Sequence, residues 1–241
     1  MIGIISKKRK RAASPGFSCV SMKSNNSIGL PPDLSDGSAV TSDSVVDHRR
    51  EFMITSRLHK YACDLTLDPN TVNHYLVLSE KNRKVTDMGQ NQSYPDHPER
   101  FDHYPQVLCG ETLTGRCYWE AEWSGDAEIS VAYKGIERKG NSDDCWFGRN
   151  EKSWSLICSD HRFTVIHNNN ETVISSSSVS KRVGVFVDVS VGTLSFYSVS
   201  DTHTLTHLHT FTHTFTDQPL CAGFGLDYSN SSVSLCHIKQ H

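Results

Sequence analysis

The sequence lacks a long hydrophobic run. None of its apolar stretches approaches the length of about 20 residues that a membrane-spanning helix needs. The apolar residues 2–5 form a run far shorter than the core of about 7–15 residues found in a secretory signal, and the basic cluster Lys7–Arg11 follows this run instead of preceding it. We therefore expect a cytoplasmic protein without membrane insertion. The cluster has two interpretations, a nuclear-import signal or a solvated basic tail.

Closely paired cysteines are also absent. None of the eight cysteines belongs to a C-x-x-C motif, so we expect reduced thiols that are buried as small apolar side chains. A RING domain needs a full set of paired Cys and His ligands, whereas residues 1–60 offer only Cys19, His48 and His59. These residues exclude a RING domain within residues 1–60.

A surplus of positive charge is lacking as well. The chain has 24 Lys and Arg against 27 Asp and Glu, a formal net charge of −3. Residues 1–60 hold ten basic and five acidic side chains, and residues 61–241 hold fourteen and twenty-two. Because an acidic body repels phosphate backbones, we expect no nucleic-acid partner.

Motifs of common enzyme classes are missing. The stretch Gly148–Ser153 only faintly resembles a phosphate-binding loop, because Glu151 stands where that motif has glycine and strand-like residues follow it. No G-x-S-x-G nucleophile elbow occurs. We therefore expect no enzymatic activity and no cofactor.

Histidine, with 13 residues, is abundant by contrast. Four of these, His203, His207, His209 and His213, would share one face of an unbroken strand, which is one way to build a divalent-ion site. The alternative is an ordinary exposed strand, and the lack of cysteine pairs favours it. We expect no metal.

Two regions precede the body of the chain. Residues 1–46 are rich in Ser, Asp, Asn, Gly, Pro and Lys, with isolated apolar residues, which is typical of a disordered tail. Residues 47–60 place Phe52, Met53 and Leu58 roughly on one helical face and predict a short helix or linker.

The remainder predicts an all-β fold. Short alternating or β-branched runs are separated by turn residues, and no long helical period appears, so we expect an antiparallel two-sheet sandwich. Ser190, Val191 and Gly192 predict a hairpin between two of the runs. The predicted strands are 117–123, 128–133, 153–158, 162–167, 171–175, 182–189, 192–199, 205–211, 220–226 and 232–238.

Three stretches resemble the PRY–SPRY family, an antiparallel β-sandwich interaction module found in tripartite-motif proteins and in fish NACHT–leucine-rich-repeat receptors. They are LTLDPNTVNHYLVLSEKNRKV (65–85), GRCYWEAEW (115–123), and VGVFVDV (183–189) with GTLSFY (192–197). Ala121 departs from the Val that the family usually has. The resemblance covers about residues 60–240 and implies a PRY segment at 61–110 and a SPRY domain at 111–241.

The Ser-rich stretch 11–27 is similar to a leader of the same fish receptors. The resemblances together imply a non-enzymatic module that binds a protein or peptide in innate immune sensing or regulation. We expect a monomer, because the coiled coil that usually forms the dimer is absent. The alternative is a regulatory or decoy fragment, or a truncated gene version, of a fish receptor or tripartite-motif protein.

The resemblance places ligand binding on loops at 94–104, 134–144, 157–162 and 226–231. The expected anchors are mainly aromatic and Arg side chains, because these residue types contribute the most binding energy per residue at interfaces. We expect Trp146 and Phe224 to contribute to the core and Arg138 and Tyr228 to be exposed. We also expect Asp188, within an apolar strand, to be a structural carboxylate. The candidate ligand-binding residues are Tyr94, Tyr104, Arg138, Trp146, Ile157, Phe224 and Tyr228.

Overall fold

The computed structural model describes residues 57–175, 179–227 and 229–238. Within these ranges the chain is almost entirely β-structure, with helical residues at 57–59 and one 3-10 turn, η2 (Asp143–Cys145). No helix of the described part is long and apolar enough to cross a membrane. The predicted tail 1–46, the cluster Lys7–Arg11 and most of the predicted helix 47–60 lie outside the described residues.

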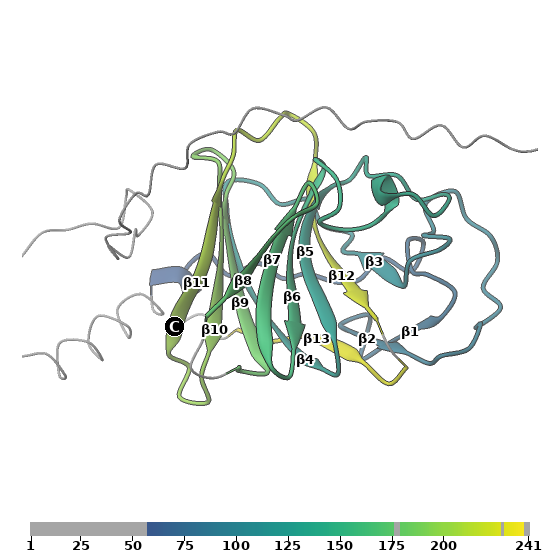
Figure 1. Cartoon of the computed structure of the whole chain (residues 1–241), viewed down its shortest axis with the longest axis horizontal. Coiled ribbons are helices and arrows are strands. Elements are labelled where there is room, and N and C mark those ends of the chain that lie inside the picture. Colours follow the sequence, from purple (N-terminus) through teal and green to yellow (C-terminus); the bar gives the residue numbers. More distant parts are fainter. Residues whose placement is uncertain (1–56, 176–178, 228, 239–241) are drawn as a thin grey trace, which may run out of the picture. The chain divides into compact units, whose positions relative to one another are not determined.

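Strands of the described residues form two antiparallel sheets, which confirms the predicted sandwich (Figure 1). The larger sheet has the order β1-β2-β13-β4-β9-β10-β11, and the smaller has the order β3-β12-β5-β6-β7-β8. The strands are β1 (Leu76–Ser79), β2 (Lys84–Asp87), β3 (Gln106–Leu108), β4 (Arg116–Ser124), β5 (Ala127–Tyr133), β6 (Ser153–Ser159), β7 (Arg162–His167), β8 (Asn170–Ile174), β9 (Arg182–Asp188), β10 (Thr193–Val199), β11 (Leu205–Thr212), β12 (Leu220–Leu226) and β13 (Ser232–Leu235).

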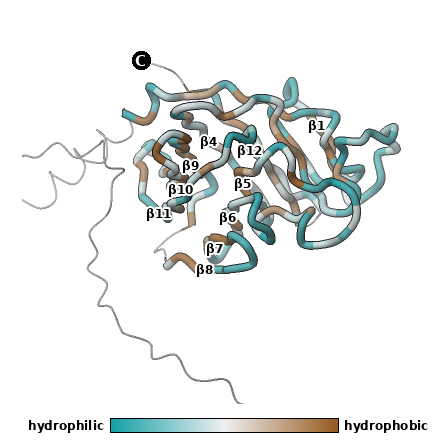
Figure 2. Tube along the Cα trace, turned by 90° about the horizontal axis from the view of Figure 1, so that it is seen from above, coloured by the Kyte–Doolittle hydropathy of each residue, from teal (hydrophilic) through white to brown (hydrophobic). Residues whose placement is uncertain are grey.

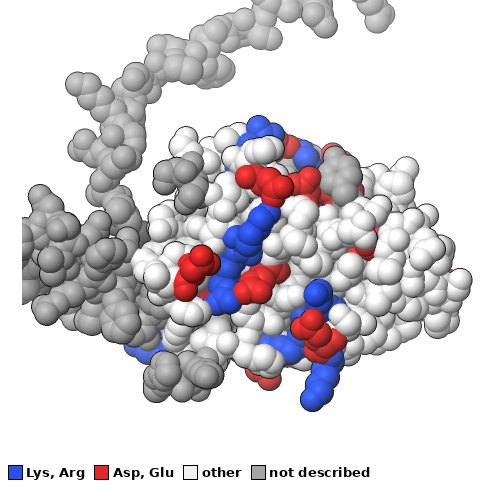
Figure 3. All heavy atoms as spheres, turned by 90° about the horizontal axis from the view of Figure 1, so that it is seen from below, with Lys and Arg blue, Asp and Glu red and all other residues white. Residues whose placement is uncertain are grey.

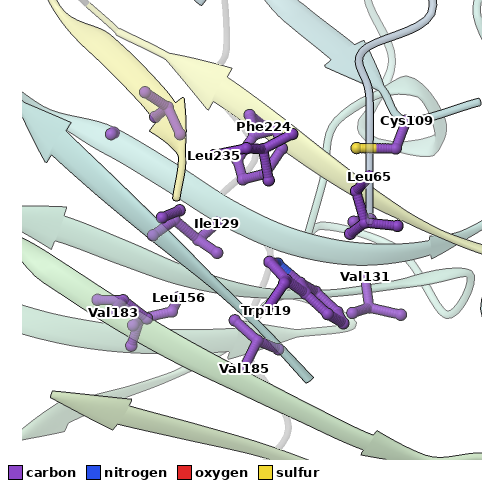
Figure 4. Packing of buried hydrophobic residues seen from close by; sticks show 14 of the residues in the cluster. Leu65, Cys109, Trp119, Ile129, Val131, Leu156, Val183, Val185, Phe224 and Leu235 are labelled. Atoms are coloured by element: carbon purple, nitrogen blue, oxygen red, sulfur yellow. The ribbon is translucent and has the colours of Figure 1, made fainter. Parts of the chain in front are cut away.

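Apolar side chains from both sheets meet in one core. Figure 4 shows Trp119 from β4 near Ile129 from β5 and Phe224 from β12, and all three are buried. Alternation along each strand produces this arrangement, since every second side chain points to the same face. In the tube view the brown, hydrophobic positions follow the strands, and the surrounding loops are mainly teal (Figure 2). The core is thus built from strand residues whose side chains point between the two sheets.

The two predicted segments are interleaved. β2, in the segment at 61–110, pairs with β13, near the end of the chain, and β3 pairs with β12. Each sheet therefore contains strands from both segments, and neither segment buries a complete core of its own.

The hairpin between β9 and β10 is confirmed. The Gly192 amide donates to the Asp188 carbonyl at 2.9 Å, and Gly192 has a φ of +78°, which glycine adopts without strain. The Asp188 carboxylate is buried. It accepts hydrogen bonds from Ser190 (2.7 Å), from the Val191 amide (3.2 Å) and from Arg116 Nε (2.6 Å), as expected of a structural carboxylate. This carboxylate therefore joins the turn to the start of β4.

The histidine-rich stretch does not form the unbroken strand that a shared histidine face would need. The register between β10 and β11 shifts: Phe196 pairs with His209 while Tyr197 pairs with His207. Leu208 is the extra residue of this bulge, which disrupts the strict alternation that a shared face requires. His207 packs against Tyr197, with ring centroids 5.6 Å apart. Among the described residues no group of three or more His, Cys, Asp or Glu side chains gathers to hold a metal ion.

Asp188→Asn keeps the shape of the turn but removes the charge that faces Arg116. We expect it to lower the free energy of unfolding by about 2 kcal/mol at neutral pH, because Arg116 loses its buried ionic partner. Burial raises the pKa of Asp188, but the hydrogen bonds from Ser190, Arg116 and Val191 outweigh it and lower the pKa overall. The stabilisation is therefore present above the unfolded pKa of about 3.9 and is lost as pH falls through the lower folded value.

Urea unfolding of Asp188→Asn and the parent chain, at about pH 7 and at about pH 2, measures this contribution. The difference between the two proteins should be largest at the higher pH. A difference of equal size at both values would contradict an ionic contribution.

Candidate functional site

The outer face of the smaller sheet carries a row of side chains that crosses four strands. Glu128 on β5 pairs with Ile157 on β6, Ile157 with Thr164 on β7, and Thr164 with Val173 on β8. We call these four residues the outer row. Val173 is 56% exposed and Ile157 is half-buried, so the row offers apolar surface to a partner.

The loop between β5 and β6 covers the neighbouring part of the same face. Phe147 from this loop is fully buried and packs edge-on against Phe101, with ring centroids 5.5 Å apart. A Cβ atom on Gly223 of β12 would lie 2.8 Å from the Phe147 ring, so the glycine makes room for it. The loop is therefore anchored by a small second core, which consists of Phe101, Leu108, Ala132, Ile136, Phe147 and Cys221.

Hydrogen bonds hold the backbone of the loop in one shape. The Asn150 side-chain amide donates to the carbonyls of Asp143 (2.9 Å) and Trp146 (2.7 Å). The Gln106 side chain of β3 donates to the Cys145 carbonyl at 2.8 Å and accepts from the Phe147 amide at 2.9 Å. These bonds fix the backbone on both sides of Trp146, so its side chain is presented in a preorganised position.

Trp146 lies between an aromatic ring and a guanidinium group. The Tyr104 ring stacks on it with centroids 4.7 Å apart and an interplanar angle of 19°, and the Arg149 guanidinium lies 4.8 Å from its centroid. All three side chains are half-buried. We call Tyr104, Trp146 and Arg149 the Trp146 stack. Its residue types are those that dominate the binding energy of protein interfaces.

Glu128 links the stack to the outer row. The carboxyl group is 5% exposed, and burial raises its pKa to about 8, although hydrogen bonds with Ser155 and Trp146 act in the opposite direction. The nearby Asp227 carboxylate also raises the pKa and Arg149 lowers it. At neutral pH the group therefore mostly carries a proton.

Three of the predicted anchors come together. Tyr104 and Trp146 form the stack, and Ile157 lies opposite Glu128 in the adjacent outer row. Trp146 is half-buried, so the expectation that it contributes to the core is wrong. The predicted loop 157–162 is mostly strand, and only 160–161 connect β6 to β7.

The remaining predicted anchors do not join this group. Tyr94 donates to the Leu76 carbonyl at 3.0 Å. Phe224 is fully buried in the main core, as expected from its apolar strand. Tyr228 lies outside the described residues.

The expected exposure of Arg138 is wrong. Its side chain is 9% exposed and donates to the carbonyls of Ile136 (2.7 Å) and Lys134 (2.8 Å). Its guanidinium carbon lies 5.1 Å from the Phe101 ring centroid. Burial lowers its pKa. Arg138 holds the covering loop in shape, so its truncation is expected to destabilise the fold.

Sequence reasoning missed four residues of the site. Glu128 occupies an outward position in the alternating run EISVAY of β5. Thr164 and Val173 occupy outward positions in β7 and β8. Arg149 follows Trp146 by three residues. The alternation marked the outward positions, but it carried no information about which of them the loop covers.

The sequence matches two family models that cover most of the described residues. Residues 65–113 match the SPRY-associated domain, PRY, and residues 116–239 match the SPRY domain. The chain therefore belongs to the SPRY family and carries the associated PRY segment, which confirms the resemblance seen in the sequence motifs.

Two kinds of relatives share the module. Stonustoxin subunit beta of Synanceia horrida is 46% identical over 162 residues, which are 66% of this chain and 23% of that protein. Tripartite motif-containing protein 16 of Mus musculus is 37% identical over 184 residues, which are 75% of this chain and 33% of that protein. The chain thus spans about a quarter to a third of the length of these relatives.

Solved structures agree with the fold. The stonustoxin structure superposes with a TM-score of 0.68 and 38% identity, covering 73% of this chain and 29% of that chain. The crystal structure of the TRIM65 PSpry domain gives a TM-score of 0.68 and 27% identity, covering 83% of this chain and 100% of that chain. The fish-receptor leader at 11–27 lies outside the described residues and stays a prediction.

Glu128→Gln tests the buried acid. The raised pKa means that the folded state retains a proton that the unfolded state releases above about pH 4.3, so stability is lost as pH rises from there to about 8. A Gln side chain does not ionise, so we expect the variant to exceed the parent by at least about 1 kcal/mol in unfolding free energy near pH 8, with the gap closing near pH 4.

Urea unfolding across this pH range is the measurement, and Glu151→Gln, at an exposed carboxylate in the same loop, is the matched control. Equal pH profiles for the Glu128 and Glu151 variants would contradict the raised pKa.

Proposed function

We propose that this chain is a non-enzymatic recognition module that binds a protein or peptide segment across the Trp146 stack and the outer row. The single observation that carries the proposal is the half-buried Trp146 side chain, which packs against Tyr104 and Arg149 on a hydrogen-bonded loop. A preorganised aromatic anchor loses little conformational freedom on binding, which favours affinity.

The chemistry of the site supports binding and not a covalent reaction. The stack presents ring faces and a guanidinium group, and Glu128 beneath it is buried and hydrogen-bonded. The SPRY domain is a protein-interaction module in tripartite-motif proteins, of which the mouse relative is one. We propose an intracellular role in innate immune sensing or regulation on the same basis.

The charges around the stack favour a partner with a basic side chain. Desolvation raises the pKa of Asp227, and the nearby Asp126 carboxylate raises it further. An incoming Lys or Arg beside Asp126 and Asp227 would relieve the repulsion between these two carboxylates. The face shown in Figure 3 differs from this acidic region, because basic and acidic side chains lie side by side on it.

Peptides selected from a random displayed library against the full chain test the proposal. We expect Trp146→Ala to weaken the selected peptides by about 30-fold or more in Kd, which corresponds to a hot-spot contribution of about 2 kcal/mol. Arg149→Ala is expected to act in the same direction, and the selected sequences are expected to contain Lys or Arg.

Val191→Ala is the matched control, because Val191 is 47% exposed on the β9–β10 hairpin of the other sheet. Isothermal titration gives the Kd values, and circular dichroism confirms that each variant is folded. Peptides that bind the Trp146 and Val191 variants with equal affinity would place the binding surface elsewhere.

A further inference from the structure

Each sheet of this protein ends in two edge strands, which present backbone N–H and C=O groups that a further strand could pair with. The larger sheet ends at β1 and β11, and the smaller sheet ends at β3 and β8. Soluble proteins usually protect such edges with a bulge, a covering segment, proline or charge. The four edges of this protein differ in how far they are protected.

Three of the edges are protected. The bulge at Leu208 interrupts β11. The Tyr94 hydroxyl covers β1 by donating a hydrogen bond to the Leu76 carbonyl at 3.0 Å. The segment before β1 runs along β3, where the Asp68 amide donates to the Leu108 carbonyl at 2.8 Å. A further strand is therefore obstructed at each of these edges.

The fourth edge, β8, has none of these protections among the described residues. Its register with β7 is continuous, it contains no proline, and β7 is its only paired neighbour in that part of the chain. Four of its five residues are exposed. Its one charged side chain, Glu171, is held by Arg149, with 2.6 Å between Oε1 and Nη1. The charge that would guard this edge is therefore neutralised.

The hairpin between β7 and β8 determines which backbone groups point to the free edge. Its turn has two residues, both with positive φ (48° and 60°), so the flanking residues His167 and Asn170 form a hydrogen-bonded pair. Such pairs alternate with pairs that are not hydrogen-bonded, so Thr172 is the next β8 residue bonded to β7. Glu171 and Val173 therefore direct their N–H and C=O groups to the free edge.

We propose that β8 pairs antiparallel with β8 of a second copy of this chain, about a twofold axis through Thr172, to form a weak dimer. In this register Glu171 lies opposite Val173 of the second copy, and the two residues exchange both backbone hydrogen bonds. The axis repeats this pair on its other side. The two Thr172 residues face each other in a pair that is not hydrogen-bonded through the backbone, the kind in which side chains come closest.

The strand is complementary to itself in this register. The Glu171 carboxylate keeps Arg149 as its partner, so no unpaired charge is brought to the axis. Val173, which is 56% exposed, gains a neighbour across the new strand pair. Opposed Thr172 side chains are a favourable cross-strand pair because their hydroxyl groups can hydrogen-bond. The side chains of β8 thus favour a second copy as its partner.

The edge is already held in one shape before pairing. The Asn168 amide donates to the Asn150 carbonyl at 3.2 Å, and the Asn169 side chain donates to the Arg149 carbonyl at 2.8 Å. These bonds tie the turn before β8 to the loop between β5 and β6. Little conformational freedom is therefore lost when the edge pairs.

The size of the contact sets its strength. Two paired strands of five residues bury less than the roughly 1,200 Å² of a standard stable interface, so we expect a Kd on the order of 100 µM. Pairing at a sheet edge needs no coiled coil, so it differs from the route on which the expected monomer rests. The axis is perpendicular to the joined sheet, and the dimer would present two Trp146 stacks on the same face, as a bivalent partner requires.

Sedimentation equilibrium of the full chain tests the proposal, and we expect the mean mass to rise from one chain toward two between about 10 µM and about 1 mM. Val173→Pro removes an N–H group that β7 does not use, which an edge strand tolerates, and it should keep the mass at one chain. Thr172→Lys and Thr172→Glu should each do the same, because like charges meet at the axis. An equimolar mixture of these two variants should associate again, since Lys then lies opposite Glu.

Thr206→Lys is the matched control, because Thr206 is an exposed threonine on the edge strand of the other sheet. It should associate as the parent does, and so should Trp146→Ala, so this proposal and the proposed peptide site fail separately. A parent chain that stays at the mass of one chain at about 1 mM would overturn the dimer. Association of Val173→Pro at the parental level would also overturn it, as would a mixture of the two Thr172 variants that stays at one chain. The mixture keeps the test intact if Val173→Pro does not fold.

Discussion

Burial of Phe147 against β12 is the constraint on which the site depends. Gly223 leaves space for the ring, and Ile136 and Leu108 enclose it. This packing holds the loop between β5 and β6 on the outer face of the smaller sheet. Trp146 directly precedes Phe147 in the chain, so the burial of Phe147 also determines where Trp146 lies on the surface.

The same packing sets the electrostatics of the face. Trp146 lies over Glu128 and, with the sheet, removes water from the carboxyl group, so its proton is retained near neutral pH. A cationic partner side chain would favour the ionised form, and binding would then release a proton. The affinity for such a partner would thus depend on pH through Glu128, which the alternating sequence marks only as outward-facing.

Particular residues show what the sequence could and could not predict. The run EISVAY predicted β5 and its faces, and Gly192 predicted the hairpin, because strand period and turn geometry are local properties. Burial of loop side chains is not local. Arg138 and Trp146 lie in one loop, and their expected exposures were reversed, since contacts with Phe101 and Tyr104 decide them. The bulge at Leu208 likewise arises from pairing with β10.

Chain topology joins these local features into one cooperative unit. β13 lies between β2 and β4, and β12 lies between β3 and β5. The last strands of the chain therefore complete both sheets, and the sheet beneath the Phe147 ring does not exist until β12 has paired with strands from both segments. Non-local pairing of this kind makes folding slow, because the entropy of closing long loops is lost before the strand contacts form. The loop that carries Trp146 therefore depends for its position on strand pairs that join both segments.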